Sequence, residues 1–140
     1  MLAVALTLSA AGCGEGGGST QPPKGPTALQ RAQQKWERSG IRSYRFRVTR
    51  PCLCPPTDRF GPATVTVRDG RPVKRPPSRL PATVEELFKT VSDGERGPGT
   101  TTVTYDPRFG VPTTIHIDPG PNVNDDETTI NVERFTRLAG

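Results

Sequence analysis

The residues of this chain that are best suited to chemistry are its three cysteines. Cys52 and Cys54 are one residue apart and are flanked by Pro51 and Pro55, whereas Cys13 stands alone near the N-terminus. Thiols outside the cytoplasm tend to oxidise, so once Cys13 is modified the remaining two correspond to one disulfide. Residues i and i+2 of a strand have Cα atoms about 6.5–7 Å apart, which is the upper limit for a disulfide. The two prolines could supply the local bend that such a bridge needs.

The Cys52–Cys54 pair has other uses that the sequence leaves open. A bridge that closes so small a ring constrains the unfolded chain little, and a labile bridge of this kind suits thiol–disulfide exchange. Arg50 and Arg59 could lower the pKa of a nearby thiol. A metal site would need further ligands, and His116 is the only histidine. A structural disulfide, a redox pair, a metal site and free thiols are the four interpretations.

Cys13 follows an apolar segment that is typical of a secretory signal. Residues 1–12 carry no charge and end in Ser-Ala-Ala-Gly, so the segment with Cys13 resembles a bacterial lipobox. In such signals the thiol receives a diacylglyceryl group and the chain is cut before it. Residues 14–26 are rich in Gly and Pro, a composition that favours a flexible tether. The sequence predicts a signal peptide over 1–12, a lipidated Cys and tether over 13–26, and one domain over 27–140.

Acidic residues near the end of the chain form a second candidate site. A solvated loop is the favoured interpretation. The alternative is a weakly bound cation such as Ca²⁺, which these oxygen ligands would suit although their spacing is not that of an EF-hand. The residues are Asp118, Asp125, Asp126 and Glu127. His116 is expected to be an exposed strand histidine. No nucleophile elbow, phosphate loop or dinucleotide fingerprint is present, so we expect a non-enzymatic protein without a cofactor.

The net charge of +5 favours anionic partners. Nucleic acid is not expected, because the protein is predicted to be exported and aromatic residues do not alternate with the basic ones. A simply solvated face is the favoured interpretation, and binding of anionic lipid or a wall polymer is the alternative. The basic residues predicted to share one face of a sheet are Arg42, Arg45, Arg47, Arg50, Arg68, Arg71, Lys74 and Arg75.

The elements that position these residues can be predicted from local patterns. Helices are expected from Thr27 to Gly40 and from Thr83 to Gly94, each starting with a capping-box pattern and ending at glycine. Alternating apolar residues predict strands, and Asp69-Gly70 predicts a tight hairpin. The expected strands cover residues 44–49, 64–67, 71–75, 101–105, 111–117 and 130–135, with a bulge before Phe135.

The order of these elements predicts the fold class. The pattern α-β-β-β-α-β-β-β with hairpin-like connections is typical of an α+β domain. We expect an antiparallel sheet of about five to six strands with both helices on one face. A chain of 140 residues accommodates one such domain.

Several segments together resemble a known family. They are Ser43–Phe46, Cys52–Pro55, Val65–Gly70, Val84–Phe88 and Tyr105–Pro112, with acidic residues from Asp118 onward. Over roughly residues 30–136 the chain resembles the bacterial lipoprotein family called domain of unknown function 6174. The resemblance implies an exported and often lipidated protein, and it brings no established activity, cofactor or catalytic residue.

Three functional hypotheses follow. The leading one is a non-enzymatic lipoprotein, anchored to the extracytoplasmic side of the cell membrane through Cys13, that binds an envelope protein or an anionic polymer. Its binding surface would be the open face of the sheet or the Cys52–Cys54 segment. The second is a thiol–disulfide redox module that uses Cys52 and Cys54. The third is an inhibitor of an envelope enzyme, which rests on the fold class alone.

Overall fold

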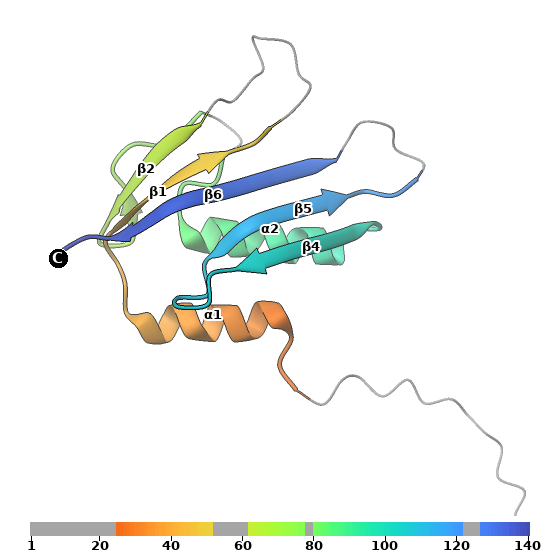
Figure 1. Ribbon diagram of the computed structural model, residues 1–140, viewed down its shortest axis with the longest axis horizontal. Coiled ribbons are helices and arrows are strands. Elements are labelled where there is room, and N and C mark those ends of the chain that lie inside the picture. Colours follow the sequence, from red (N-terminus) through yellow and green to blue (C-terminus); the bar gives the residue numbers. More distant parts are fainter. Residues whose placement is uncertain (1–24, 52–61, 78–79, 122–126) are drawn as a thin grey trace, which may run out of the picture.

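The described part of the chain forms two helices packed on one face of a six-stranded sheet (Figure 1). The computed structural model describes residues 25–51, 62–77, 80–121 and 127–140. The elements in chain order are α1 (Ala28–Ser39), β1 (Tyr44–Thr49), β2 (Ala63–Arg68), β3 (Arg71–Pro72), α2 (Val84–Arg96), β4 (Thr100–Tyr105), β5 (Pro112–Asp118) and β6 (Thr128–Arg137).

The sheet has the strand order β3-β2-β1-β6-β5-β4, and every pair of neighbours is antiparallel. Its centre is therefore the pair β1–β6, which joins the first and last strands of the chain. Both helices lie on the same side of this sheet. The predicted fold class, an antiparallel sheet with two helices on one face in the order α-β-β-β-α-β-β-β, is confirmed.

α1 begins and ends where the sequence predicts. The Thr27 side chain accepts a hydrogen bond from the Gln30 backbone N–H at 3.1 Å, and the Gln30 side chain accepts one from the Thr27 N–H at 2.8 Å. This reciprocal pair satisfies two N–H groups that the helix leaves without partners. Gly40 ends the helix at φ 63°, in the left-handed region.

α2 is longer than the prediction. It continues past Gly94 to Arg96, so the expected stop at Gly94 is wrong. A Cβ at position 94 would lie 2.6 Å from Thr101 Oγ1 and 3.0 Å from Ile117 Cδ1. Glycine therefore lets the helix approach β4 and β5 closely and does not end it.

The N-terminus of α2 is capped by Thr83, as predicted, because the Thr83 side chain accepts a hydrogen bond from the Glu86 N–H. The capping box is not completed, since the Glu86 carboxylate accepts from the Ala82 N–H at 2.7 Å.

The turns and the bulge follow from local sequence. Asp69 and Gly70 adopt φ 49° and 77°, the positive values that a type I′ hairpin turn requires. β3 is a two-residue edge strand within the expected range 71–75, as Pro72 predicts, and Pro72 at this edge disrupts no inner ladder. In β6, Arg134 has φ 53° and the pairing with β1 shifts by one residue between Arg45 and Arg47. This bulge confirms the prediction and turns Phe135 toward the helices.

The core lies between the sheet and the helices. The fully buried side chains include Tyr44, Phe46, Val48, Leu87 and Ile115. Phe135 stacks on Tyr44 with 5.5 Å between ring centroids and meets Trp36 edge-on at 5.9 Å. The bulge therefore supplies an aromatic link between the central strand pair and α1.

Candidate functional site

Most of the predicted thiol and acidic sites lie outside the described residues. Cys13, Cys52, Cys54, Asp125 and Asp126 are in the ranges that the structure does not describe. The disulfide, redox, metal and lipidation interpretations therefore stay predictions.

The two described members of the acidic set are not brought into a metal site. Asp118 Oδ1 accepts the Gly120 backbone N–H at 2.8 Å, and Glu127 is exposed. Within residues 25–51, 62–77, 80–121 and 127–140, no three His, Cys, Asp or Glu side chains gather as metal ligands. The cation site stays a prediction that depends on residues outside these ranges.

The sheet face away from the helices is the first candidate binding surface, and we call it the open face. Along each strand the residues that alternate with the buried ones point to this face. Threonine is the commonest residue type there. The members, read from burial and register, are Thr49, Thr64, Thr66, Thr100, Thr102, Thr104, Thr114, Thr129 and Thr136, with Arg45, Arg47, Arg68, Arg71, His116, Asp118, Asn131 and Glu133.

His116 lies within this array on β5, as predicted, but its side chain is half-buried and not exposed as expected. It pairs across strands with Thr102 on one side and Thr129 on the other. Its Nδ1 is 3.1 Å from Thr129 Oγ1, and the side chain is half-buried. The ring therefore contributes one more polar group to a surface of hydroxyls.

Positive charge collects on the β1–β2–β3 half of the open face. Arg45 and Arg47 alternate along β1, and Arg68 pairs with Arg71 across the hairpin. None of the four forms an ion pair with a described residue. Glu133 of β6 is the cross-strand neighbour of Arg47, and Arg68 Nη1 donates to the Ala139 carbonyl at 3.0 Å. Among the described residues, this half of the surface therefore presents guanidinium groups without ion pairs next to threonine hydroxyls.

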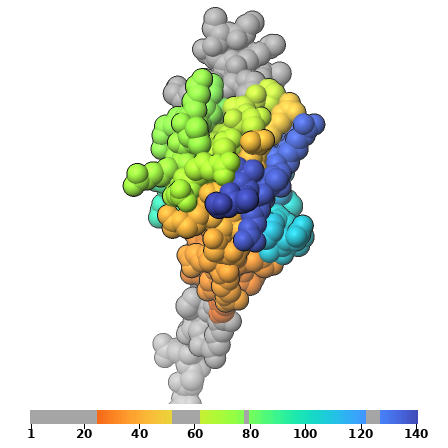
Figure 2. Space-filling view, turned by 90° about the vertical axis from the view of Figure 1, so that its left-hand side faces the viewer, coloured from red at the N-terminus to blue at the C-terminus, as the bar shows by residue number. Residues whose placement is uncertain are grey.

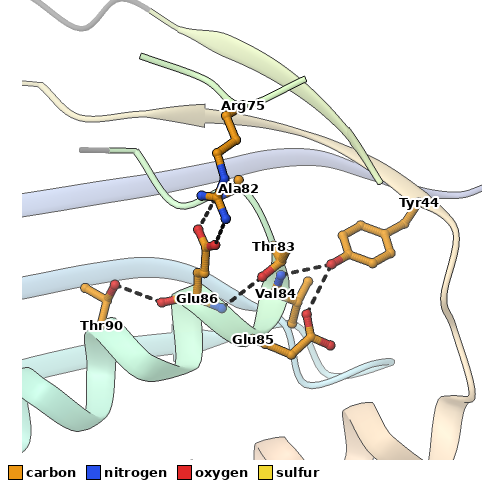
Figure 3. Close-up of polar contacts among 8 residues, drawn as sticks. All are labelled: Tyr44, Arg75, Ala82, Thr83, Val84, Glu85, Glu86 and Thr90. Carbon is orange, nitrogen blue, oxygen red and sulfur yellow. Dashed lines mark hydrogen bonds and ion pairs between the residues drawn. The ribbon is translucent and has the colours of Figure 1, made fainter. Parts of the chain in front are cut away.

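Other members of the predicted basic set lie elsewhere. Arg75 Nη2 is 2.9 Å from Glu86 Oε1 on α2 (Figure 3), so its placement on the open face is wrong. Arg42 donates to the Asp69 carbonyl beside the hairpin turn, and Arg50 donates to Thr128 Oγ1 at 3.1 Å. The alternation of β1 was a sound guide to Arg45 and Arg47, but residues beyond the strand ends did not follow it.

A second basic surface, on α1, was missed at the level of sequence. Arg31, Lys35 and Arg38 are spaced by four and three residues, so they share one helix face. Together with Arg108 from the β4–β5 turn they line a surface hollow beside Phe109. We call these four residues the α1 basic face. Their spacing was the available signal, but exposed helices commonly carry such charges, so the pattern alone did not mark a site.

The side chains of the α1 basic face make contacts with backbone carbonyls and with an aromatic ring. Arg31 Nη1 donates to the Pro26 carbonyl at 2.6 Å, and Lys35 Nζ donates to the Pro107 carbonyl at 2.8 Å. The Arg108 guanidinium carbon lies 5.1 Å from the centre of the Phe109 ring. None of these contacts neutralises a charge. No described helix is long and apolar enough to cross a membrane.

Hydrogen bonds connect the polar atoms of two buried aromatic residues, Trp36 and Tyr44, to the start of α2. The Tyr44 hydroxyl accepts the Val84 backbone N–H at 3.0 Å and lies 3.4 Å from Glu85 Oε2, to which it donates (Figure 3). Glu85 Oε1 accepts the Trp36 indole N–H at 2.9 Å. Burial raises the pKa of Tyr44 well above its usual value, and the nearby Glu85 carboxylate adds to the effect. These contacts join α1, α2 and β1, and they position the helices under the sheet.

Comparison with known proteins gave one match. A family model described as a family of unknown function (DUF6174) matches residues 28–137. No curated protein and no solved structure matches the chain. The matched range covers both helices and all six strands, and so includes the open face and the α1 basic face.

Proposed function

Because the chain belongs to this family of unknown function, we propose its role from its own surfaces: a membrane-tethered, non-enzymatic binding module of the bacterial cell envelope. The open face would bind an anionic, hydroxyl-bearing polymer. The observation that carries the proposal is the combination of threonine hydroxyls and of arginines that form no ion pair with a described residue, on a sheet face that neither helix covers. The tether rests on the lipobox-like segment before Cys13.

The chemistry of the open face suits a polymer with charged groups at regular intervals. Guanidinium groups donate paired N–H bonds to phosphate or carboxylate oxygens. Threonine hydroxyls both donate and accept, as polymer hydroxyl groups do. Neighbouring strands lie about 4.8 Å apart, and residues on one face of a strand are about 6.6 Å apart, so the polar groups form a regular grid. Many weak contacts along a chain then add up to useful affinity.

Arg45 and Arg47 make the sharpest test, because neither has a described side-chain partner to lose. We expect the full chain to bind immobilised poly(glycerol phosphate) and the double variant Arg45→Gln, Arg47→Gln to bind it at least tenfold more weakly. The double variant Lys35→Gln, Arg38→Gln removes the same charge from α1 and should bind within twofold of the parent. Equal losses in both variants, or no binding by the parent, would contradict the proposal.

A further inference from the structure

The α1 basic face lies on the side of the helix that points away from the core. Leu29, Ala32 and Trp36 are buried against the sheet and α2. Arg31, Lys35 and Arg38 are exposed on the opposite side of the helix. Figure 2 shows α1 at the end of the domain remote from β2, in agreement with Figure 1. The three cations are therefore presented outward together.

The charge of this face is not balanced by its described neighbours. The surface hollow is lined by Arg31, Lys35, Arg38 and Arg108, and none of its lining residues is Asp or Glu. None of the four forms an ion pair with another described residue. Phe109 adds a half-buried ring at the edge. A cationic surface beside a half-buried aromatic ring is complementary to anionic lipid headgroups.

The N-terminal end of the domain lies at the same place. Arg31 contacts the Pro26 carbonyl, so the chain enters the domain at the α1 basic face. Cys13 is 12 positions before Gly25, a length that spans at most about 40 Å when fully extended. A lipid on Cys13 would therefore keep this face within reach of the bilayer surface at all times.

We propose that the α1 basic face docks on the anionic headgroups of the membrane to which the chain is tethered. This inference rests on the tether of the proposed function. The diacylglyceryl group on Cys13 supplies two acyl chains and would anchor the chain by itself, so docking would hold the domain against the bilayer. It would also orient the domain, because α1 lies under the sheet and the open face points the other way. The open face would then be turned from the bilayer toward the envelope polymer.

The test measures vesicle binding by a protein that lacks the lipid anchor on Cys13. The full chain carrying Cys13→Ser is mixed with vesicles of phosphatidylglycerol and phosphatidylcholine, or of phosphatidylcholine alone, and bound protein is separated by flotation. Segment 1–12 is the same in every sample, so the dependence on phosphatidylglycerol and on salt reports the charged surface. We expect clear preference for vesicles with phosphatidylglycerol, lost at high salt.

Two matched variants locate the binding surface. Each basic residue near an anionic surface contributes roughly fivefold in affinity, so Lys35→Gln, Arg38→Gln should weaken binding by about tenfold or more. Arg45→Gln, Arg47→Gln should stay within twofold of the parent. If the first variant fails to fold by circular dichroism, Arg31→Gln, Arg108→Gln replaces it. Equal effects of the α1 and open-face pairs, or no preference for phosphatidylglycerol, would overturn the proposal.

The same samples separate this inference from its premise and from a rival partner. Binding of free poly(glycerol phosphate) through Lys35 and Arg38, with no binding to vesicles, would assign the α1 basic face to a polymer and overturn the docking. An unmodified Cys13 in the cell would contradict the tether but would leave the vesicle result unchanged. Failure of either idea is thus seen independently of the other.

Discussion

The Glu85 carboxylate on α2 accepts the indole N–H of Trp36 on α1, with 2.9 Å between Nε1 and Oε1. Its second oxygen is the acceptor for the Tyr44 hydroxyl of β1. One side chain thus satisfies the polar atoms of two buried aromatic residues. This contact helps to hold both helices on the face of the sheet opposite the open face. The proposal that the open face binds a polymer and the α1 basic face binds the membrane depends on this arrangement.

Replacing Glu85 should destabilise the domain. Glu85→Ala leaves the Trp36 N–H and the Tyr44 hydroxyl without this acceptor, and an unsatisfied buried group costs about 1–3 kcal/mol. Because the Glu85 side chain itself is exposed and water can replace part of the contact, we expect a loss of about 1–2 kcal/mol in urea unfolding. Glu95→Ala on the same helix is the control, and it should cost less than about 0.5 kcal/mol. Equal losses would show that the contact is not stabilising.

Gly110 should be less tolerant than Gly70, although both adopt φ 77°. A Cβ at position 110 would lie 2.4 Å from the Ala32 carbonyl oxygen of α1, whereas at position 70 the nearest atom is 3.4 Å away at the end of Arg42. The left-handed conformation costs both alanine variants about 1–2 kcal/mol. Gly110→Ala should lose a further 1–3 kcal/mol, roughly, because the turn must move from α1. Thermal unfolding checks this, and similar losses for both variants would contradict the close packing.

The pKa shifts of the tyrosines predict how stability depends on pH. Burial raises the pKa of Tyr105 to about 12, and it raises that of Tyr44 further. In the unfolded chain both would titrate near 10.0. The unfolded state therefore loses protons first, so the contribution of these groups is complete below about pH 10 and declines as the pH rises above it. Tyr44→Phe should flatten the decline measured by urea unfolding.

A direct titration checks the same shifts. The chain has only two tyrosines. While the protein stays folded, tyrosinate absorbance should stay low at about pH 10, where free tyrosine is half ionised. An absorbance step there in the folded protein would contradict the burial of both hydroxyl groups.

The cysteine pair distinguishes the proposed binding module from a redox protein. The double variant Cys52→Ser, Cys54→Ser should retain binding to poly(glycerol phosphate) within twofold, because the proposal assigns binding to the open face. Thiol titration with and without reductant reports whether the pair is bridged. A bridge that glutathione reduces readily, together with loss of the cellular phenotype in the double variant, would favour the redox hypothesis instead.

The sequence predicted well those features that depend on neighbouring residues. The capping box at Thr27, the hairpin at Asp69-Gly70 and the bulge before Phe135 all arise from local conformational preferences. The end of α2 was not predictable in this way, because Gly94 is required by contact with Thr101 and Ile117 on other strands. The pairing of β1 with β6 likewise joins distant segments that no local pattern connects.

The candidate surfaces were predicted in part. Alternation along β1 placed Arg45 and Arg47 on one face, since strand periodicity determines direction. It could not place Arg75, whose position depends on an ion pair with Glu86 of α2. The α1 basic face needed the β4–β5 turn to bring Arg108 beside the helix, and this proximity appears only in the folded protein.

The central claim is that a folded domain is held at the membrane by a lipid on Cys13. The most direct measurement is the intact mass of the protein from the membrane fraction, followed by the mass of its N-terminal peptide. We predict a chain that starts at Cys13, without residues 1–12, and carries a diacylglyceryl thioether on the Cys13 sulfur. A free thiol at Cys13 on a chain that still contains residues 1–12 would contradict the account.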